Sequence, residues 1–293
     1  MSKKYTWGLF SILAILLVGA LAFFFQDATF DVLDPRGAIA QQQRELMVIV
    51  TLLMLIVVIP VFVLVTLIVF KYRDGKNSEY DPSLEGNKAL EVIWWTIPLA
   101  VIVVLSGVIW KSSHQLDPFR PVAAEKKPIT VQVVSLQWKW LFIYPEQNIA
   151  TVNYLQVPED TPINFKLTSD APMNSFWIPQ LGGQVYTMSG METSLHLIAN
   201  EPGEYIGKSA NLSGEGFAGM HFTTKATSDA EFEQWVQTVK QAPRNLTFED
   251  YKTLAAPSEN DTVKYYASKE KDLFKSIIQK YTAPGSTGHE EMH

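Results

Sequence analysis

The stretch best suited to chemistry is a loop of glycines and small polar residues that ends in a methionine. Residues 205–222 read YIGKSANLSGEGFAGMHF, and Met220 offers a thioether sulfur, a soft ligand suited to copper. The loop also offers the hydroxyls of Ser209 and Ser213 and the amide of Asn211. A serine hydroxyl stays protonated at neutral pH, and an asparagine amide is a weak, neutral ligand. Met220 alone would hold copper weakly, so we interpret it as a packing group.

The chain of 293 residues contains no cysteine and carries a net charge of −6. The lack of cysteine excludes disulfides, thiolate nucleophiles, iron–sulfur clusters and any copper–thiolate centre. The acidic balance argues against a nucleic-acid partner. His114, His196 and His221 form no ligand-spaced cluster, and we interpret them as surface or structural side chains. His289 and His293 lie in a polar tail that we expect to be disordered.

A second candidate for chemistry is Glu91, which directly precedes the apolar sequence VIWWTIP. An ionisable group at the edge of a membrane span is a default candidate for a functional site, here proton uptake. The alternative is structural, because the helix dipole favours a water-exposed carboxylate at a helix N-terminus. The residues themselves leave both interpretations open.

Three runs are apolar enough to cross a bilayer, which takes about 20 residues of helix. They are residues 7–25, 46–70 and 92–110. The second run contains no charged side chain, and its Pro60 is tolerated where neighbouring groups satisfy the freed carbonyl. The first run is ambiguous, because Lys3 and Lys4 before an apolar stretch are also typical of a signal peptide. We favour a retained helix, since the run continues through the candidate cleavage site at residues 20–22.

The distribution of basic residues predicts the orientation of these spans. The N-terminus and the loop between the second and third runs are rich in basic residues, at Lys3, Lys4, Lys71, Arg73, Lys76 and Lys88. The loop of residues 26–45 has only Arg36 and Arg44, among several acids. We therefore expect the N-terminus and the second loop in the cytoplasm, and the chain after about residue 111 outside it.

From residue 129 to residue 226 the hydrophobic pattern has the two-residue period of β-strands. Residues 162–168 and 192–199 alternate apolar and polar side chains, and residues 129–136 and 221–225 are further candidates. Turn signals such as Glu201-Pro202-Gly203 separate them. Several short strands with this spacing predict an all-β sandwich of about a hundred residues.

Beyond residue 228 the pattern becomes helical. Ser228 and Glu231 form a capping box, and Pro243 ends the helix that they start. Residues 247–254 and 263–281 predict two more helices, the second with apolar side chains on one side. This aromatic-rich stretch resembles the extension found on quinol-oxidase subunit II, which packs on the sandwich. The alternative is a solvated amphipathic tail.

Three motifs follow one another along the chain. They are Gln137-Trp138-Lys139-Trp140 with Tyr144, residues 169–179 (SDAPMNSFWIP) and the loop of residues 205–222. In this order and spacing they resemble subunit II of the haem–copper respiratory oxidases. There the first motif lies beneath a copper site, the second carries the first copper-ligating histidine, and the third is the copper-binding loop. The resemblance covers roughly residues 46–226.

The resemblance implies that nearly every copper ligand of the family is replaced in this chain. Asn174 stands for the first histidine, Ser209 and Ser213 for the bridging cysteines, Asn211 for the glutamate that lends a carbonyl, and Phe217 for the second histidine, while Met220 is retained. A mixed-valence copper pair needs thiolate bridges and imidazole nitrogens. We therefore expect no metal in this loop.

Two more features of the resemblance concern the electron donor and the protons. Cytochrome c oxidases carry an acidic docking residue where this chain has Tyr186, within the sequence LGGQVYTMSG. A lipid-soluble quinol donor would need no such acid. Glu91 matches the family's motif at the entrance of a proton pathway into subunit I, together with Trp94 or Trp95, Thr96 and Pro98.

The resemblance thus implies subunit II of a bacterial haem–copper quinol oxidase, a copper-free relative of cytochrome c oxidase subunit II. The expected fold is a membrane-anchored all-β protein, with N-terminal transmembrane helices, a cupredoxin-like Greek-key β-sandwich and a short α-helical C-terminal extension. The expected segments are residues 1–26 (a transmembrane helix or a signal peptide), 27–120 (a transmembrane hairpin), 121–227 (the extracytoplasmic sandwich) and 228–293 (the extension and tail).

By the same resemblance, the complex oxidises membrane quinol, reduces oxygen to water and pumps protons across the bacterial inner membrane. The haems, one copper and the principal quinol site are expected in subunit I, so this chain would bind no cofactor itself. Its expected partners are subunits I, III and IV, membrane lipid and quinol, with neither nucleic acid nor cytochrome c among them.

Two alternatives are a cytochrome c oxidase subunit II and a free-standing, membrane-tethered module of cupredoxin type. The absence of cysteine argues against the first. Nothing in the soluble half excludes the second, but the motif at Glu91 favours a subunit that docks on another membrane protein.

Overall fold

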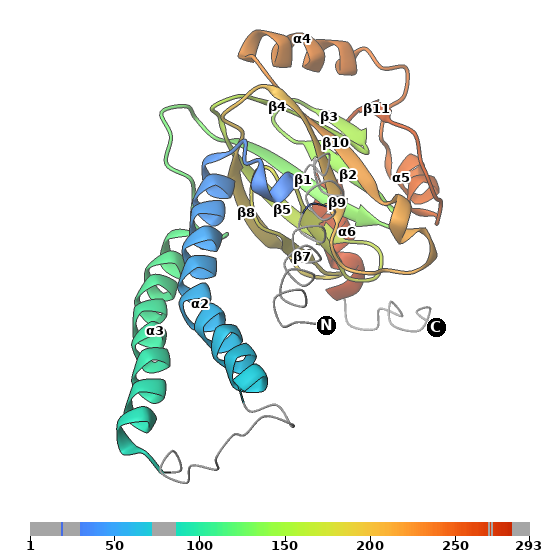
Figure 1. Ribbon diagram of the computed structural model, residues 1–293. Helices are drawn as coiled ribbons and strands as arrows, with labels where there is room; N and C mark the ends of the chain where they lie inside the picture. The colour runs from blue at the N-terminus through green and yellow to red at the C-terminus, as the bar shows by residue number, and fades with distance from the viewer. Residues whose placement is uncertain (1–18, 20–29, 72–85, 269, 271, 283–293) are drawn as a thin grey trace. The chain divides into compact units, whose positions relative to one another are not determined.

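The computed structural model describes residues 19, 30–71, 86–268, 270 and 272–282 (Figure 1). The chain divides into two compact units, residues 1–34 and 35–293. In the first unit, the described segment contains the 3-10 helix η1, Asp31–Leu33. The first apolar run lies outside the described residues apart from Gly19, and so do the tail histidines and most of the loop between the second and third runs.

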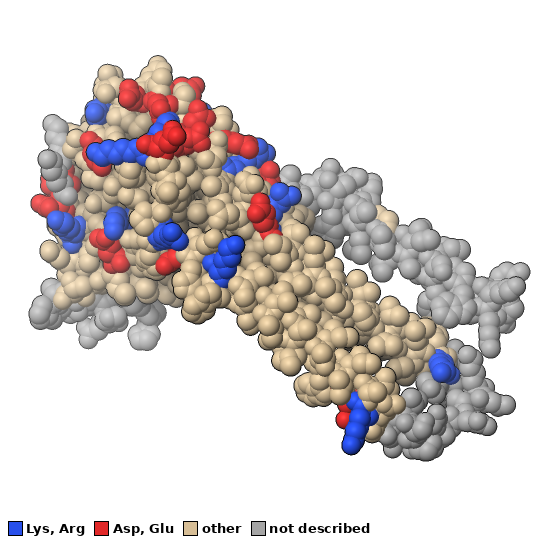
Figure 2. Space-filling view, turned by 90° about the vertical axis from the view of Figure 1, so that its left-hand side faces the viewer, with Lys and Arg blue, Asp and Glu red and all other residues tan. Residues whose placement is uncertain are grey.

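Two long helices open the second unit. α2 (Ala38–Lys71) has 34 residues and α3 (Lys88–Gln115) has 28, more than the roughly 20 that span a bilayer. Their apolar side chains are exposed, with Phe62, Trp95 and Trp110 at 69%, 73% and 72%. On the face shown in Figure 2, charged side chains gather away from the middle of the helices. Both helices are long and apolar enough to cross a membrane, and the second and third predicted spans, residues 46–70 and 92–110, lie within them.

The rest of the second unit is a β-sandwich with C-terminal additions. One sheet has six strands in the order β11-β3-β2-β1-β5-β8, and the other has five in the order β4-β10-β9-β6-β7. Two neighbouring pairs, β1–β5 and β4–β10, are parallel. The strand bounds are β1 Ile129–Leu136, β2 Lys139–Tyr144, β3 Ile149–Val152, β4 Tyr154–Pro158, β5 Pro162–Ser169, β6 Asn174–Trp177, β7 Val185–Thr187, β8 Thr193–Ile198, β9 Gly203–Ser209, β10 His221–Thr227 and β11 Lys264–Ala267.

The core between the two sheets is built on aromatic rings. Trp140, Phe142 and Phe165 come from the six-stranded sheet, and Phe176 and Phe222 from the other, each at most 1% exposed. The rings of Phe176 and Phe222 stack with centroids 5.2 Å apart. Side chains of this size dominate the energetics of a core, so these rings hold together the two sheets that carry the loops.

The four strands predicted from alternation are confirmed as β1, β5, β8 and β10. Strand β2 was missed because all six of its residues are buried. Its inner face meets the aromatic core, and its outer face, with Leu141 and Ile143, meets the C-terminal residues. A strand covered on both faces has no apolar–polar alternation.

The C-terminal stretch contains the helices α4 (Asp229–Lys240), α5 (Phe248–Ala255) and α6 (Leu273–Thr282). The capping box of Ser228 and Glu231 is confirmed. The prediction of one helix over residues 263–281 is wrong in its first part, because β11 pairs antiparallel with β3 there. The unpaired edge of β3 offers hydrogen bonds that a helix could not use, and the two tyrosines of the sequence KYYA favour a strand.

The C-terminal stretch packs on the outer face of the six-stranded sheet, and is not a solvated tail. A second apolar cluster joins Val134, Leu136, Leu141, Ile143, Ala150 and Val152 of that sheet to Leu246, Tyr251, Leu254, Tyr266, Leu273, Phe274 and Ile277. At roughly 25 cal/mol per Å² of buried apolar surface, this layer contributes substantially to stability. The alternative of a solvated tail is therefore wrong for residues 246–277.

The outer ends of both long helices are bonded to the sandwich. Before α2, the main-chain N–H of Arg36 donates to the carbonyl of Gln180 at 2.8 Å, and its carbonyl accepts from the N–H of Asn200 at 3.0 Å. A Cβ at Gly37 would lie 2.3 Å from the carbonyl oxygen of Ile198, so only glycine fits. After α3, the carbonyl of Pro118 accepts from the main-chain N–H of His196 at 3.2 Å.

Candidate functional site

The glycine-rich loop connects β9 to β10 at one end of the sandwich. The N–H of Ser209 donates to the carbonyl of Met220 at 3.2 Å, which closes the loop at its base. Met220 is 1% exposed and belongs to the aromatic core. Its thioether is therefore directed into packing and is not presented to a ligand.

The structure brings Asn174, Ser209 and Asn211 together. The hydroxyl of Ser209 donates to Oδ1 of Asn174 at 2.9 Å, and Nδ2 of Asn174 donates to the carbonyl of Pro172, also at 2.9 Å. Both side chains are buried. Asn211 Nδ2 donates to the carbonyl of Met173 at 2.8 Å, which ties the loop to the segment before β6.

Ser213 and Phe217 lie further along the loop, where Trp138 shapes its path. Trp138 Nε1 donates to the carbonyl of Ser213 at 3.1 Å, and a Cβ at Gly216 would lie 2.5 Å from the Trp138 ring. Trp138 itself has a φ of 65°, which is uncommon for a bulky residue. Phe217 is half-buried in the 3-10 helix η3, Glu215–Gly219. The loop thus keeps a defined path through packing against an indole.

This set of donors does not fit a dinuclear copper centre. A mixed-valence copper pair is bridged by deprotonated thiolates, whereas the hydroxyl of Ser209 keeps its proton and donates a hydrogen bond to Oδ1 of Asn174. Phe217 has no donor atom. Within the described part of the chain, no three His, Asp or Glu side chains cluster as a metal site would require.

Tyr186 lies in β7 and is 50% exposed. Its carbonyl accepts a hydrogen bond from the hydroxyl of Thr193 at 2.8 Å. Along the same segment, the hydroxyl of Ser189 donates to the carbonyl of Ala171 at 3.0 Å. This edge of the sandwich thus presents a half-exposed phenol.

The structure also reveals Asp170, a buried carboxylate to which sequence reasoning gave no role. Its side chain is 1% exposed and lies 2.7 Å from Lys280 Nζ. The hydroxyls of Tyr251 and Tyr281 donate to its two oxygens. Burial, followed by the negative charge of Asp170, raises the pKa of Tyr251 well above its ordinary value. No local signal reveals this group, because its partners Tyr251 and Lys280 lie 81 and 110 residues further along the chain.

Two parts of this chain match known protein families, and the whole chain is similar to known proteins. Residues 20–109 match the family model "Cytochrome C oxidase subunit II, transmembrane domain", and residues 240–285 match "COX Aromatic Rich Motif". The chain is 47% identical over 294 residues to cytochrome bo(3) ubiquinol oxidase subunit 2 of Pseudomonas putida, covering 99% of this chain and 92% of that protein. This chain belongs to the quinol oxidase subunit 2 family.

Other members of the quinol oxidase subunit 2 family align along most of their length. Ubiquinol oxidase subunit 2 of Acetobacter aceti is 47% identical over 254 residues, covering 86% of this chain and 82% of that protein. Quinol oxidase subunit 2 of Bacillus anthracis is 41% identical over 257 residues, covering 87% and 88%. The two family models fall on the helical hairpin and on the layer that contains α5, β11 and α6.

The remaining candidate from the sequence is Glu91. Glu91 is exposed in the first turn of α3, and Asn87 caps that helix by accepting from the N–H groups of Ala89 and Leu90 at 3.1 and 3.3 Å. Because α3 continues from Gln115 into the sandwich, Glu91 lies at the opposite end of the span. This place suits both the helix-end interpretation and proton uptake.

Proposed function

We propose that this chain is subunit II of a respiratory quinol:oxygen oxidoreductase, whose complex oxidises membrane quinol, reduces oxygen to water and pumps protons. The single observation that carries the proposal is the hydrogen bond from Ser209 to Asn174. Groups that bond to each other occupy the positions where soft copper ligands would accept electrons from a protein donor. Electrons would therefore enter the complex elsewhere, as they can from a lipid-soluble quinol. The names of the relatives support this conclusion.

In this proposal the chain has a structural role. The hairpin of α2 and α3 packs against subunit I in the bacterial inner membrane, and the sandwich, after about residue 111, covers its extracytoplasmic face. Subunit I holds the haems, one copper and the principal quinol site, and subunits III and IV and membrane lipid complete the surroundings. The excess of basic residues at the end of the hairpin away from the sandwich, including Lys71 and Lys88, supports this orientation.

Glu91 has a separate proposed role as the entrance of a proton pathway into subunit I. Its place in the first turn of α3, at the cytoplasmic end in this orientation, supports the role. The carboxylate would exchange protons with water and pass them to groups of the neighbouring subunit.

The choice of electron donor tests the proposed function. Oxygen consumption by the purified complex is measured with a reduced short-chain quinol and with reduced cytochrome c, and a copper-containing cytochrome c oxidase serves as the positive control for the second donor. We expect rapid turnover with quinol and none above background with cytochrome c. Rapid oxidation of cytochrome c would reject the proposal, and purification of the chain without a haem-bearing partner would favour a free-standing module.

A further inference from the structure

The cluster around Asp170 joins two distant parts of the chain. Asp170 lies in the short segment between β5 and β6, and its N–H donates to the carbonyl of Ser135 at 2.9 Å. Its carboxylate accepts from the Tyr251 hydroxyl at 2.6 Å and from Lys280 Nζ at 2.7 Å, and the Tyr281 hydroxyl completes the set. A carboxylate buried this deeply is stable only when charge and hydrogen bonds compensate it. The C-terminal helices provide both.

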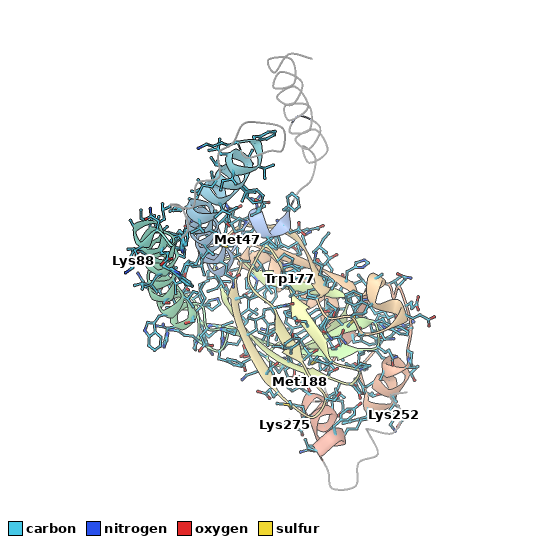
Figure 3. The ribbon with its side chains drawn as sticks, turned by 60° about the horizontal axis from the view of Figure 1, so that its bottom comes forward. Met47, Lys88, Trp177, Met188, Lys252 and Lys275 are labelled. Atoms are coloured by element: carbon cyan, nitrogen blue, oxygen red, sulfur yellow. The ribbon has the colours of Figure 1, made fainter. Side chains whose placement is uncertain are left out.

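The same helices contact a second loop. Tyr281 lies against this loop, since a Cβ at Gly190 would lie 3.1 Å from the Cβ of Tyr281. Gly190 has a φ of +75°, so a side chain there is disfavoured on two counts. Figure 3 places Met188, at the start of this loop, near α6, which carries Lys275. α6 therefore touches the segment of residues 169–174 and the loop of residues 188–191 together.

Neither loop is held by burial of its own large side chains. Met173 is 44% exposed and Met191 is 51% exposed. The two loops bond to each other through Ser189 and the carbonyl of Ala171. Loops with few buried apolar contacts open at low free-energy cost unless another element restrains them.

We propose that the helices α5 and α6 form a C-terminal latch, which holds residues 169–174 and 188–191 in place by binding the carboxylate of Asp170. The first of these two segments ends at Asn174, which accepts the hydrogen bond from Ser209. In a metalloprotein, coordinate bonds tie such loops together. Here an ion pair and two phenol hydrogen bonds, made by a distant segment, fix the same end of the sandwich.

Amide hydrogen exchange of the detergent-purified complex tests the latch. Asp170→Asn removes the charge that Lys280 and the two tyrosines recognise. Hydrogen bonds to a charged group are each worth about ten- to hundredfold in an equilibrium, so we expect about tenfold or more faster exchange in residues 169–175, 186–192 and 273–282. Tyr281→Phe should accelerate exchange in the same peptides to a smaller extent. The matched control is Glu249→Gln, which breaks the exposed ion pair with Lys252 on the outside of α5 and should leave the three peptides unchanged.

Faster exchange confined to α6, with the two loops unchanged, would overturn the proposal, because the C-terminal helices would then not restrain the loops. Unchanged exchange in all three peptides would do the same. If Asp170→Asn does not accumulate, Lys280→Met and Tyr281→Phe replace it as the test variants, since both keep the carboxylate. Faster exchange of the two loops in both variants supports the latch, and unaltered loops in either one reject it.

Discussion

The hydroxyl of Ser209, at the end of β9, donates a hydrogen bond to the amide oxygen of Asn174, at the start of β6, over 2.9 Å. Two buried polar groups thereby satisfy each other across neighbouring strands of one sheet. The pair joins two neighbouring strands at this end of the sandwich, and in the proposed function its hydroxyl and amide stand where copper would need a thiolate and an imidazole. The proposed function depends on this contact.

Copper analysis gives the first prediction. We expect the purified complex to contain only the copper expected in subunit I, because the loop of residues 209–220 lacks thiolate and imidazole donors. Elemental analysis against haem content measures this directly. An additional pair of copper ions, or an intense visible thiolate–copper band in the copper-treated chain, would contradict it.

Ser209→Ala should destabilise the sandwich. The substitution leaves the buried amide oxygen of Asn174 without its donor, and an unsatisfied buried acceptor costs about 1–3 kcal/mol. The measurement is the thermal unfolding midpoint of the full-length chain in detergent. Thr238→Ala is the control, since that hydroxyl donates to a carbonyl on the exposed face of α4. Equal midpoints for the two variants would show that the buried pair contributes nothing.

Gly37→Ala should disrupt the junction between α2 and the sandwich. The new Cβ would lie 2.3 Å from the main-chain oxygen of Ile198, which cannot move without breaking β8. Gly182→Ala is the comparison, because its Cβ would meet the end of the Leu197 side chain at 2.5 Å, and a side chain can rotate away. We expect the yield of assembled complex to fall much further for Gly37→Ala. Similar yields for the two variants would show that position 37 does not require glycine.

The stability of the chain should depend on Asp261 at acid pH. Burial opposes ionisation of this carboxyl, but hydrogen bonds from Lys264, Ser258 and Lys139 outweigh it and lower its pKa to about 2. A folded-state pKa below the unfolded value of about 3.9 stabilises the fold above that pH, and the contribution is lost as pH falls toward 2. Asp261→Asn should therefore flatten the fall in unfolding midpoint between about pH 4 and pH 2. An unchanged pH profile would exclude this carboxyl as a contributor.

Glu91→Gln should slow turnover of the complex without changing its haem content, because the amide cannot carry a proton into subunit I. Oxygen consumption with quinol and the haem spectrum are the two measurements. Glu45→Gln is the control, since Glu45 is an exposed acid in the opposite, sandwich-side half of the hairpin. Turnover equal to that of the parent complex would leave Glu91 as a helix-end charge.

The sequence by itself determined those elements whose physical cause is local. The apolar runs within α2 and α3, the alternation in β5 and the capping box of Ser228 and Glu231 each depend on residues close together in the chain. The prediction that this loop holds no copper pair also depends on residue types alone, since no arrangement can turn serine and phenylalanine into soft ligands.

Tertiary structure alone decided the features that depend on distant partners. β2 is hidden from periodicity because the C-terminal layer covers its outer face, and β11 exists because the edge of β3 was free to pair. The role of Asp170 follows from Lys280, which lies 110 residues further along the chain. The sequence does not show whether a carboxylate in a loop faces water or a lysine, because the fold determines its surroundings.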